Sequence, residues 1–504
     1  MLYISSFSES IRTYLLVICN IEIPQTQDYW KMLLHLITLN KRYMITKVNC
    51  AIDSNMQDIV LDLQTLIRQP SSASNKQNLV RCAHLVAATM TKANIKTELI
   101  YLNDQGEDDI PPIVFGEVKS RSNPLGKTIL FYNHYDVQPE GPVDLWNNVH
   151  PFSGDVDGNY IFGRGSSDDK GQLITRIKAV EYYLKETGDV PCNIKFIVEG
   201  EEEIGSLHIQ EYLLKYEKKF ACDGIIWEFG LVDSKDRAVI NLGLKGILSV
   251  DLVARGPSHD IHSSLAVLVE NPAWILVRAL GTINDKNERI LINEWYRDIK
   301  NTTEEEIRAI ENEPFDKDDF KKEYGVKKFV DNLDGVEPQK ALIERPTCNI
   351  CGLSSGYTGK GSKTVLPAKA IARLEFRLVP DMDPEKQFAR LQDHLVEKGF
   401  ENSIELKMID GVKPARTSIN DPFVKSVKSA ATETFGKTVI SVSSAGSGSM
   451  YHFKKILGAP CICIGGSYKY NRSHSPNEFA RLDLINKATK CIANIMRNYG
   501  QDNL

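Results

Sequence analysis

The sequence is poor in cysteine and in long apolar runs, and it carries no excess of basic residues. Ten cysteines in 504 residues, at irregular spacings, are too few for a disulfide-built scaffold. We therefore expect a reducing compartment, the cytoplasm. No apolar run reaches the roughly 18 residues of a membrane-spanning helix. A net charge of −5 gives no sign of a nucleic-acid-binding surface. We expect neither a membrane nor a nucleic acid as a partner.

What the chain does contain suits a protein of more than one domain. It is 42% hydrophobic and 25% charged, which is enough apolar material for a sizeable core. We set residues 1–50 apart as an N-terminal extension without an assigned role. The apolar run Tyr14–Ile21 is not followed by the small residues of a cleavage site, which argues against a secretory signal. Attachment to a membrane through this extension stays open as an alternative.

From residue 51 the apolar pattern alternates between strands and helices. Short apolar runs predict buried strands, and apolar residues three or four apart predict helices. Such alternation is typical of an α/β domain with a mainly parallel sheet flanked by helices. The strands are expected at 97–102, 113–118, 127–133, 193–199, 224–227 and 460–465, and the helices at 57–68, 78–93, 172–186 and 421–436.

A second type of pattern begins near Gly243. Residues 247–254 and 370–379 alternate apolar and polar side chains, as antiparallel strands with one wet face do. Helices are expected at 272–283 and 384–399, and the charged stretch 284–344 is expected to be helical and solvated. We therefore predict an inserted α+β domain over 243–408, which divides the α/β domain into 51–242 and 409–504.

Polar side chains gather where the predicted strands of the α/β domain end. They are His134, Asp136, Asp168, Glu202, Glu203, Glu228 and His474. The carboxyl ends of strands in open α/β sheets are the usual place for ligands. Several carboxylates buried together repel one another and lose hydration, and bound cations remove that cost. The pattern indicates a site for two divalent metals with a spare carboxylate as general base.

Each of these motifs by itself has an ordinary explanation. A histidine at a strand end is more often structural than a ligand, and the EGEEE run alone would be a solvated acidic turn. The acids before the helix at 172–186 alone would be favoured by the helix dipole. Cys348 and Cys351 form a CxxC pair without the second pair that a zinc ribbon needs. The joint occurrence at successive strand ends favours the metal site.

At this point the sequence resembles a known family, the dinuclear zinc exopeptidases and deacylases. The family includes carnosine dipeptidases, carboxypeptidase G, acetylornithine deacetylase and succinyl-diaminopimelate desuccinylase. The resemblance covers residue 56 to the C-terminus and rests on motifs that occur in the family's order: HYDVQP, GRGSSDDKG, EGEEEIGS, WEFG, DIHSS, FRLVP and SHSPNE. It implies a zinc-exopeptidase-like catalytic domain with an inserted lid and dimerisation domain, and hence a homodimer.

The resemblance also implies a role for each polar residue. Asp168 matches the carboxylate that bridges both metals. His134 and Glu228 would complete one metal site, and Glu203 and His474 the other. The metals would be two Zn²⁺ ions, with Mn²⁺ or Co²⁺ as alternatives that the same ligand types accept.

Four more residues match the family's reaction machinery. Asp136 matches the residue that orients His134, and Glu202 matches the general base. His262 matches a histidine that reaches into the partner subunit's site and polarises the scissile carbonyl. Arg377 matches the arginine that binds a substrate carboxylate. From the sequence alone, His262 would be a surface-loop histidine and Arg377 a charge on a strand face.

The implied reaction is metal-assisted hydrolysis of an amide bond. We expect dipeptides or short peptides with a free carboxylate as substrates, because the long inserted domain and the motif forms are most like the dipeptidase and carboxypeptidase members. An N-acyl-amino-acid deacylase is the alternative, followed by a non-catalytic relative that keeps the fold. The side-chain preference for the substrate is left open.

Overall fold

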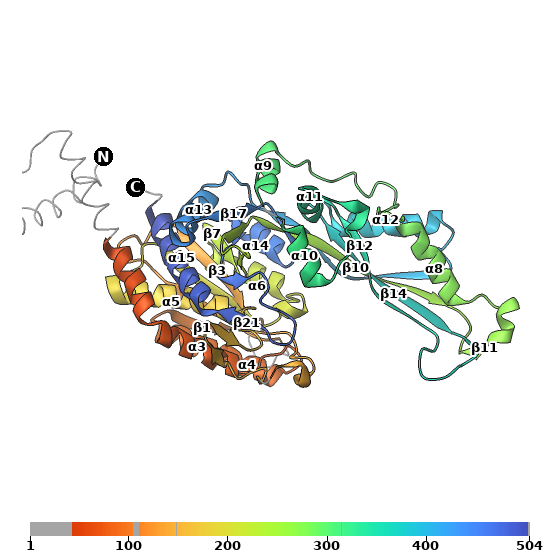
Figure 1. Ribbon diagram of the computed structural model, residues 1–504, viewed down its shortest axis with the longest axis horizontal. Coiled ribbons are helices and arrows are strands. Elements are labelled where there is room, and N and C mark those ends of the chain that lie inside the picture. The colour runs from red at the N-terminus through yellow and green to blue at the C-terminus, as the bar shows by residue number, and fades with distance from the viewer. Residues whose placement is uncertain (1–42, 104–109, 148, 314, 502–504) are drawn as a thin grey trace, which may run out of the picture.

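The chain forms two lobes, seen side by side in Figure 1. This computed structural model describes residues 43–103, 110–147, 149–313 and 315–501. The larger lobe combines the beginning and the end of the described chain, and the elongated lobe comes from its middle. Most of the predicted N-terminal extension, including the apolar run at 14–21, lies outside the described residues.

The larger lobe is built on a ten-stranded sheet in the order β1-β2-β6-β3-β7-β19-β9-β8-β20, with β17 paired to β9. The central strands β6, β3, β7 and β19 run parallel, whereas β1, β2, β8 and β9 add antiparallel pairings on both sides. The predicted α/β class is confirmed, with these antiparallel flanks added. The strands are β1 (Lys96–Ile100), β2 (Ile113–Val118), β3 (Thr128–His134), β6 (Asn193–Glu199), β7 (Gly224–Trp227), β8 (Leu231–Val232), β9 (Ala238–Asn241), β17 (Thr438–Ser441), β19 (Cys461–Cys463) and β20 (Ser467–Tyr468).

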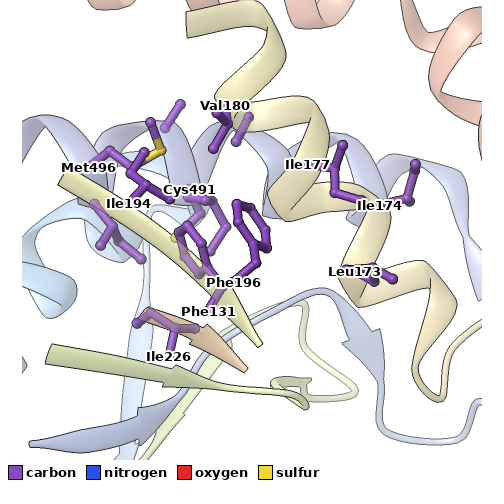
Figure 2. Close-up of a cluster of buried hydrophobic side chains, with 14 of the residues drawn as sticks. Phe131, Leu173, Ile174, Ile177, Val180, Ile194, Phe196, Ile226, Cys491 and Met496 are labelled. Atoms are coloured by element: carbon purple, nitrogen blue, oxygen red, sulfur yellow. The ribbon is translucent and has the colours of Figure 1, made fainter. Parts of the chain in front are cut away.

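Helices pack on this sheet through a continuous hydrophobic core. Figure 2 shows Phe131 of β3 and Phe196 of β6 between Ile177 of α5 and Met496 of α15. Each fully buried side chain of this size stabilises the fold by roughly 1.5–3 kcal/mol relative to exposure. The helices of this lobe are α3 (Met56–Arg68), α4 (Lys76–Lys92), α5 (Lys170–Thr187), α6 (Ile209–Lys215), α7 (Glu217–Phe220), α13 (Pro422–Phe435), α14 (Met450–Leu457) and α15 (Leu482–Gln501).

The folded region begins earlier than the sequence analysis expected. Residues 43–54 form a helix, and its side chains Ile45, Val48 and Ile52 are buried in the core of the larger lobe. Their spacing of three and four residues is the same helical pattern that identified α3. The boundary at residue 51 therefore cuts through a helix that belongs to the core.

The second lobe contains a sheet whose four long strands, in the order β12-β14-β10-β15, pair with one another antiparallel. These strands are β10 (Gly243–Arg255), β12 (Thr347–Ser355), β14 (Lys369–Leu378) and β15 (Ile404–Val412). Helices α8 (Pro272–Ile283) and α12 (Pro384–Glu397) cover the apolar face, on which Leu248 and Leu374 are buried. The opposite face stays polar, as the alternating pattern predicted. β15 runs past the expected boundary at residue 408.

Strand β10 also connects the two lobes. Its first residues pair with β16 (Ala415–Arg416) and β18 (Ser444–Ser447), which come from the last part of the chain. Smaller elements complete the fold: β4 (Val156–Asp157), β5 (Tyr160–Phe162), β21 (Phe479–Arg481), β11 (Ile261–His262) and β13 (Val365–Leu366). No helix among the described residues is both long enough and apolar enough to span a membrane.

The charged stretch after α8 is helical, but it is not wholly solvated. It forms α9 (Glu304–Asn312), α10 (Lys317–Tyr324) and α11 (Glu337–Glu344). Thr303 and Glu306 cap α9 reciprocally, as the sequence indicated. Ile310 and Ile343 are buried against Val442 from the end of the chain. The stretch therefore packs onto the larger lobe as well as onto its own.

Candidate metal centre

Three parallel strands bring polar side chains to one edge of the large sheet. His134 is the last residue of β3, which lies between β6 and β7. Glu202 and Glu203 lie in the short helix η2 (Glu202–Ile204) directly after β6, and Glu228 follows β7. Because parallel strands end at the same edge, residues about 70 and 95 positions apart become neighbours.

Asp168 lies at the centre of the cluster. One of its carboxylate oxygens, Oδ1, is 3.2 Å from Nε2 of His134, and the other, Oδ2, is 3.1 Å from Nε2 of His474. The same nitrogen of His474 is 3.2 Å from Oε2 of Glu203. Asp168 thus faces a different histidine with each oxygen. That is the arrangement a carboxylate needs in order to bridge two cations.

Asp136 holds the ring of His134. Nδ1 of His134 lies 3.0 Å from the backbone oxygen of Asp136 and 3.3 Å from its carboxylate. A carbonyl oxygen only accepts, so Nδ1 carries the proton and Nε2 is directed toward Asp168. The other carboxylate oxygen of Asp136 accepts a hydrogen bond of 2.9 Å from the backbone N–H of Glu203. Asp136 therefore ties β3 to η2 as well as orienting the histidine.

Asp169 supports the strand rather than capping the helix. It occupies the N-cap position of α5, but its side chain makes no capping bond. Its carboxylate accepts hydrogen bonds from the side chain of Asn133 at 2.6 Å and from the backbone N–H of His134 at 3.2 Å. Burial raises the pKa of Asp169 to about 7. These contacts make Asp169 a support for the end of β3 and for His134.

The cluster carries more negative charge than the protein alone can stabilise. Burial, together with the nearby charges of Asp168 and Glu203, raises the pKa of Glu202 to about 8. Burial and the charge of Glu202 raise the pKa of Glu228 well above its usual range, and Oε2 of Glu228 is buried without a hydrogen-bond partner. Hydrogen bonds that the ring of His474 donates to Asp168 and Glu203 raise the pKa of His474 to about 10. Bound cations would relieve each of these shifts.

The donor atoms fit divalent cations. Ligand atoms of His134, Asp168 and Glu203 all lie within 4.8 Å of one another. Imidazole nitrogen with carboxylate oxygen is the ligand type that zinc accepts, and manganese and cobalt accept it too. His474 has a φ of 63°, in the left-handed region that histidine adopts more often than most non-glycine residues. The residues present therefore fit a metal centre.

Glu478 supports the loop that carries Asp168, a role that no sequence pattern indicated. Its carboxylate accepts backbone hydrogen bonds from Gly165 at 3.1 Å, Ser167 at 3.0 Å and Asp168 at 3.1 Å. It also receives a bond of 2.7 Å from Arg164. Glu478 lies within the SHSPNE motif, so a signal was present. Nothing in the spacing indicated a contact with residues some 310 positions earlier.

The structure does not bring His262 to the cluster. β11, which ends at His262, lies at the far end of the second lobe (Figure 1). The ring is exposed, with Nδ1 2.7 Å from the hydroxyl of Ser264 and Nε2 3.4 Å from that of Thr364.

Arg377 lies nearer to the junction of the lobes. It sits on β14, half-buried, and donates a hydrogen bond of 2.7 Å to Glu375. It lines a cavity that β10 and β18 also border. The structure thus places Arg377 beside the strand that joins the two lobes.

Comparison with known proteins agrees with this geometry. Residues 130–498 match the model of peptidase family M20/M25/M40. The chain is 32% identical to the Cys-Gly metallodipeptidase dug1 of Schizosaccharomyces pombe over 388 residues, which is 74% of this chain and 78% of that protein. It is 29% identical to the human Beta-Ala-His dipeptidase over 410 residues, 78% of this chain and 80% of that protein.

A solved structure shares the fold across both lobes. The crystal structure of an M20 family metallo-carboxypeptidase from Sulfolobus solfataricus matches with a TM-score of 0.81 and 35% sequence identity, covering 88% of this chain and 99% of that one. The chain therefore belongs to peptidase family M20/M25/M40 and is a metal-dependent peptidase.

Proposed function

We propose that this protein is a dipeptidase that hydrolyses the amide bond of small peptides with a free carboxylate. Two relatives of similar length are named as dipeptidases, for Cys-Gly and for Beta-Ala-His. The observation that carries the proposal is the placement of Asp168 between His134 and His474, one carboxylate oxygen toward each. That symmetry suits a pair of metal ions acting on one amide bond.

We assign the ligands in two sets that share Asp168. His134 and Glu228 would complete one set, and Glu203 and His474 the other. Zn²⁺ is the proposed metal, and Mn²⁺ or Co²⁺ would suit the same donors. When bound, such cations lower the pKa of the water they hold and place positive charge beside the developing oxyanion.

Glu202 is the proposed general base. It lies next to Glu203 in η2, and its carboxylate is close enough to His134 and Asp168 for their charges to act on its pKa. Its raised pKa of about 8 shows that a proton is easily kept there. Glu202 would take a proton from the attacking water and deliver it to the leaving amine. Asp136 keeps its orienting role toward His134.

His262 is proposed to act across a dimer. In its own chain it lies far from Asp168, so it would need a second copy to reach a metal centre. The second lobe offers surface for such a contact: β12 is an exposed edge strand with Ile350 49% and Leu353 59% exposed. Unpaired strand edges with apolar side chains favour pairing with another chain. The region 243–408 would then serve as the lid and dimerisation domain, with His262 polarising the scissile carbonyl.

Arg377 is the proposed binding group for the substrate's carboxylate, because a guanidinium pairs with a carboxylate through parallel hydrogen bonds. We also propose the cytoplasm as the site of action. The cysteines that the structure describes are unpaired, and two of them, Cys461 and Cys463, lie two residues apart on β19. The reducing conditions of the cytoplasm would keep such thiols from oxidising.

The test is metal analysis combined with a hydrolysis panel on the purified protein. We expect about two bound divalent ions per chain and turnover of dipeptides. Turnover of N-acetyl or N-succinyl amino acids without dipeptide cleavage would make the protein a deacylase. If the purified protein binds metal but hydrolyses no substrate of the panel, it is a binding protein.

A further inference from the structure

A cavity of about 880 Å³ lies at the junction of the lobes, against the polar face of the second sheet. Lys245 of β10, Arg377 of β14 and Thr347 of β12 form its floor. Its wall comes from the charged stretch after α8, and Ala445 of β18 borders it. Residues from four separate parts of the sequence thus enclose one space.

The wall is aromatic and belongs to no hydrophobic core. Phe315, Phe320 and Phe329 line the cavity, with ring centroids 5.4 to 5.8 Å apart. All three remain half-buried, and none packs against any of the buried clusters of the described chain. Leaving three phenylalanines partly in water forgoes a large part of their burial free energy. Such a surface beside a cavity is suited to an apolar group that fills it.

Two cations sit on the floor of this cavity, on one face of the sheet. Ile247 lies opposite Arg377, and Lys245 lies two residues before Ile247, so both charged side chains project to the same side. Lys245 is only 2% exposed, and its ammonium donates a hydrogen bond of 2.6 Å to the backbone oxygen of Arg345. Burial and the neighbouring charges of Arg377 and Arg416 lower its pKa to about 8.

Lys245 has no carboxylate partner among the described residues. The acidic side chains that line the cavity have other partners, since Asp331 pairs with Arg345 and Glu288 accepts from Asn284. A buried cation without an anion is costly, and an arriving carboxylate would remove the cost.

A short segment of the chain at β18 has one end at the cavity and the other beside Glu202. Ala445 borders the cavity, and three residues later a Cβ built on Gly448 would lie 3.9 Å from Oε1 of Glu202. Three residues of strand span about 10 Å, roughly the length of a dipeptide. The aromatic wall is also tied to the centre, because Tyr470 hydrogen-bonds to Asp319, the neighbour of Phe320 on α10. Tyr470 lies four residues before His474.

We propose that this cavity is a specificity pocket for the C-terminal residue of the substrate. Its free carboxylate would lie between Lys245 and Arg377, and a large apolar side chain, aromatic above all, would fill the space against Phe315, Phe320 and Phe329. In a C-terminal residue, the carboxylate and the side chain are both bonded to the same Cα atom. A single cavity that holds both cations and aromatic rings can therefore bind the two groups together. The inference rests on the proposed dipeptidase function and adds the substrate class.

The first test compares kcat/KM for Ala-Phe and Ala-Ala. We expect the wild type to prefer Ala-Phe by at least about 10-fold, and Phe320→Ala to reduce that ratio by about 10-fold. Phe388→Ala is the matched control, because Phe388 is half-buried in the same lobe but packs against its core and lies outside the cavity. It should lower stability and leave the ratio unchanged.

Two outcomes of this test separate the two proposals. Equal cleavage of Ala-Ala and Ala-Phe by the wild type, or an unchanged ratio in Phe320→Ala, overturns the pocket and leaves the dipeptidase standing. Cleavage of no dipeptide at all overturns both.

The second test concerns the carboxylate. Lys245→Met should raise KM for Ala-Phe by about 10-fold and leave the amide Ala-Phe-NH₂ as poor a substrate as it is for the wild type. Lys245→Arg keeps the positive charge, so its KM for Ala-Phe should stay close to the wild-type value. Thermal melting of both variants shows whether they fold. If a folded Lys245→Met protein loses activity equally on Ala-Phe and on Ala-Phe-NH₂, Lys245 does not bind the substrate's carboxylate.

Discussion

The two lobes of this protein present their polar residues in opposite ways. At the end of the large sheet, His134 is fully buried and contacts Asp136 and Asp168 within its own chain. On the second lobe, His262 is exposed, and its ring contacts the hydroxyl groups of Ser264 and Thr364 and the backbone N–H of Ser264. The first region is preorganised by folding, whereas the role proposed for His262 in the second would need a second copy of the chain.

The difference has a physical origin in the two architectures. A parallel sheet covered on both faces encloses its strand ends, so polar groups there are buried together and must satisfy one another. An antiparallel sheet with one wet face leaves its polar side chains in solvent. The comparison therefore predicts large effects from small changes in the first region, and effects in the second that depend on assembly.

Removal of the proposed general base, Glu202, should have the largest effect on activity. Glu202→Gln removes proton acceptance while keeping the size of the side chain, so kcat should fall by about 10²- to 10⁴-fold with bound metal unchanged. Glu201→Gln is the control, because Glu201 contacts His208 at 2.8 Å instead of facing the cluster. Metal analysis and dipeptide turnover measure both. Near-normal turnover by Glu202→Gln would assign the base elsewhere.

His262→Ala should lower kcat by about 10²- to 10³-fold, the usual cost of one oxyanion donor. The sharper measurement mixes His262→Ala with Glu202→Gln protein under conditions that exchange subunits. A heterodimer would contain one site with an intact Glu202 and the partner's His262, so activity should return to about a quarter of the wild-type value in a 1:1 mixture.

His259→Ala is the control for that experiment, since His259 is a neighbouring exposed histidine that contacts only Ser258. If mixing restores nothing, His262 does not act across a dimer. The contrast between the two lobes would then have to be explained by closure within one chain.

Glu478→Gln should weaken metal binding by about 10- to 100-fold, because one oxygen that accepts backbone N–H groups of the Asp168 loop becomes a donor. Competition with a chromophoric chelator measures the Kd. At saturating metal, kcat should return close to normal, which separates positioning from catalysis. Unchanged affinity would show that Arg164 and the rest of the loop hold Asp168 without Glu478.

The smallest expected effect is the pH dependence of stability without metal. The folded-state pKa of His474 is raised to about 10 from about 6.5, and that of Glu202 to about 8 from about 4.5. Both groups hold a proton more strongly when folded, so the stability that this gives declines as pH rises through these values. The Tm of the metal-free protein should fall by a few degrees between pH 6 and pH 9.

Metal should reverse that trend, because ligands bind cations only after losing their protons. The Tm difference between the metal-loaded and the chelator-treated protein should therefore widen as pH rises over the same range. A constant difference would mean that the cluster is not what binds the metal. The second lobe carries no comparable buried cluster among its described residues, so its contribution to this trend should be small.

Much of the fold was predictable because its signals are local. Asp421 and Pro422 begin α13, and the reciprocal cap of Thr303 and Glu306 begins α9, as their sequence patterns indicate. The short strands β8, β9, β17 and β20 were not predicted. Each is two to four residues long, which is too short for a recognisable pattern of apolar residues. Each is a strand because it pairs with another strand of the sheet.

The candidate site divides in the same way. His134 and Asp136 lie two residues apart at a strand end, and this spacing by itself puts them on one side. The predicted strand ends also indicated Asp168, Glu203 and the other polar residues as a group. The role of Glu478 could not be predicted, since its partners are backbone N–H groups far away in the sequence. Nor could the placement of Lys245 and Arg377 on one face of the sheet, which depends on the register of β10 against β14.

The sequence by itself determined the two kinds of sheet, the strand ends at which polar residues collect and the chemical types that collect there. These follow from periodicity and capping, which act over a few residues. Only the tertiary structure decided that Asp168 faces two histidines at once, that Glu478 holds its loop, and that His262 lies out of reach within one chain. Those depend on strand order and register, which set distances between residues hundreds of positions apart.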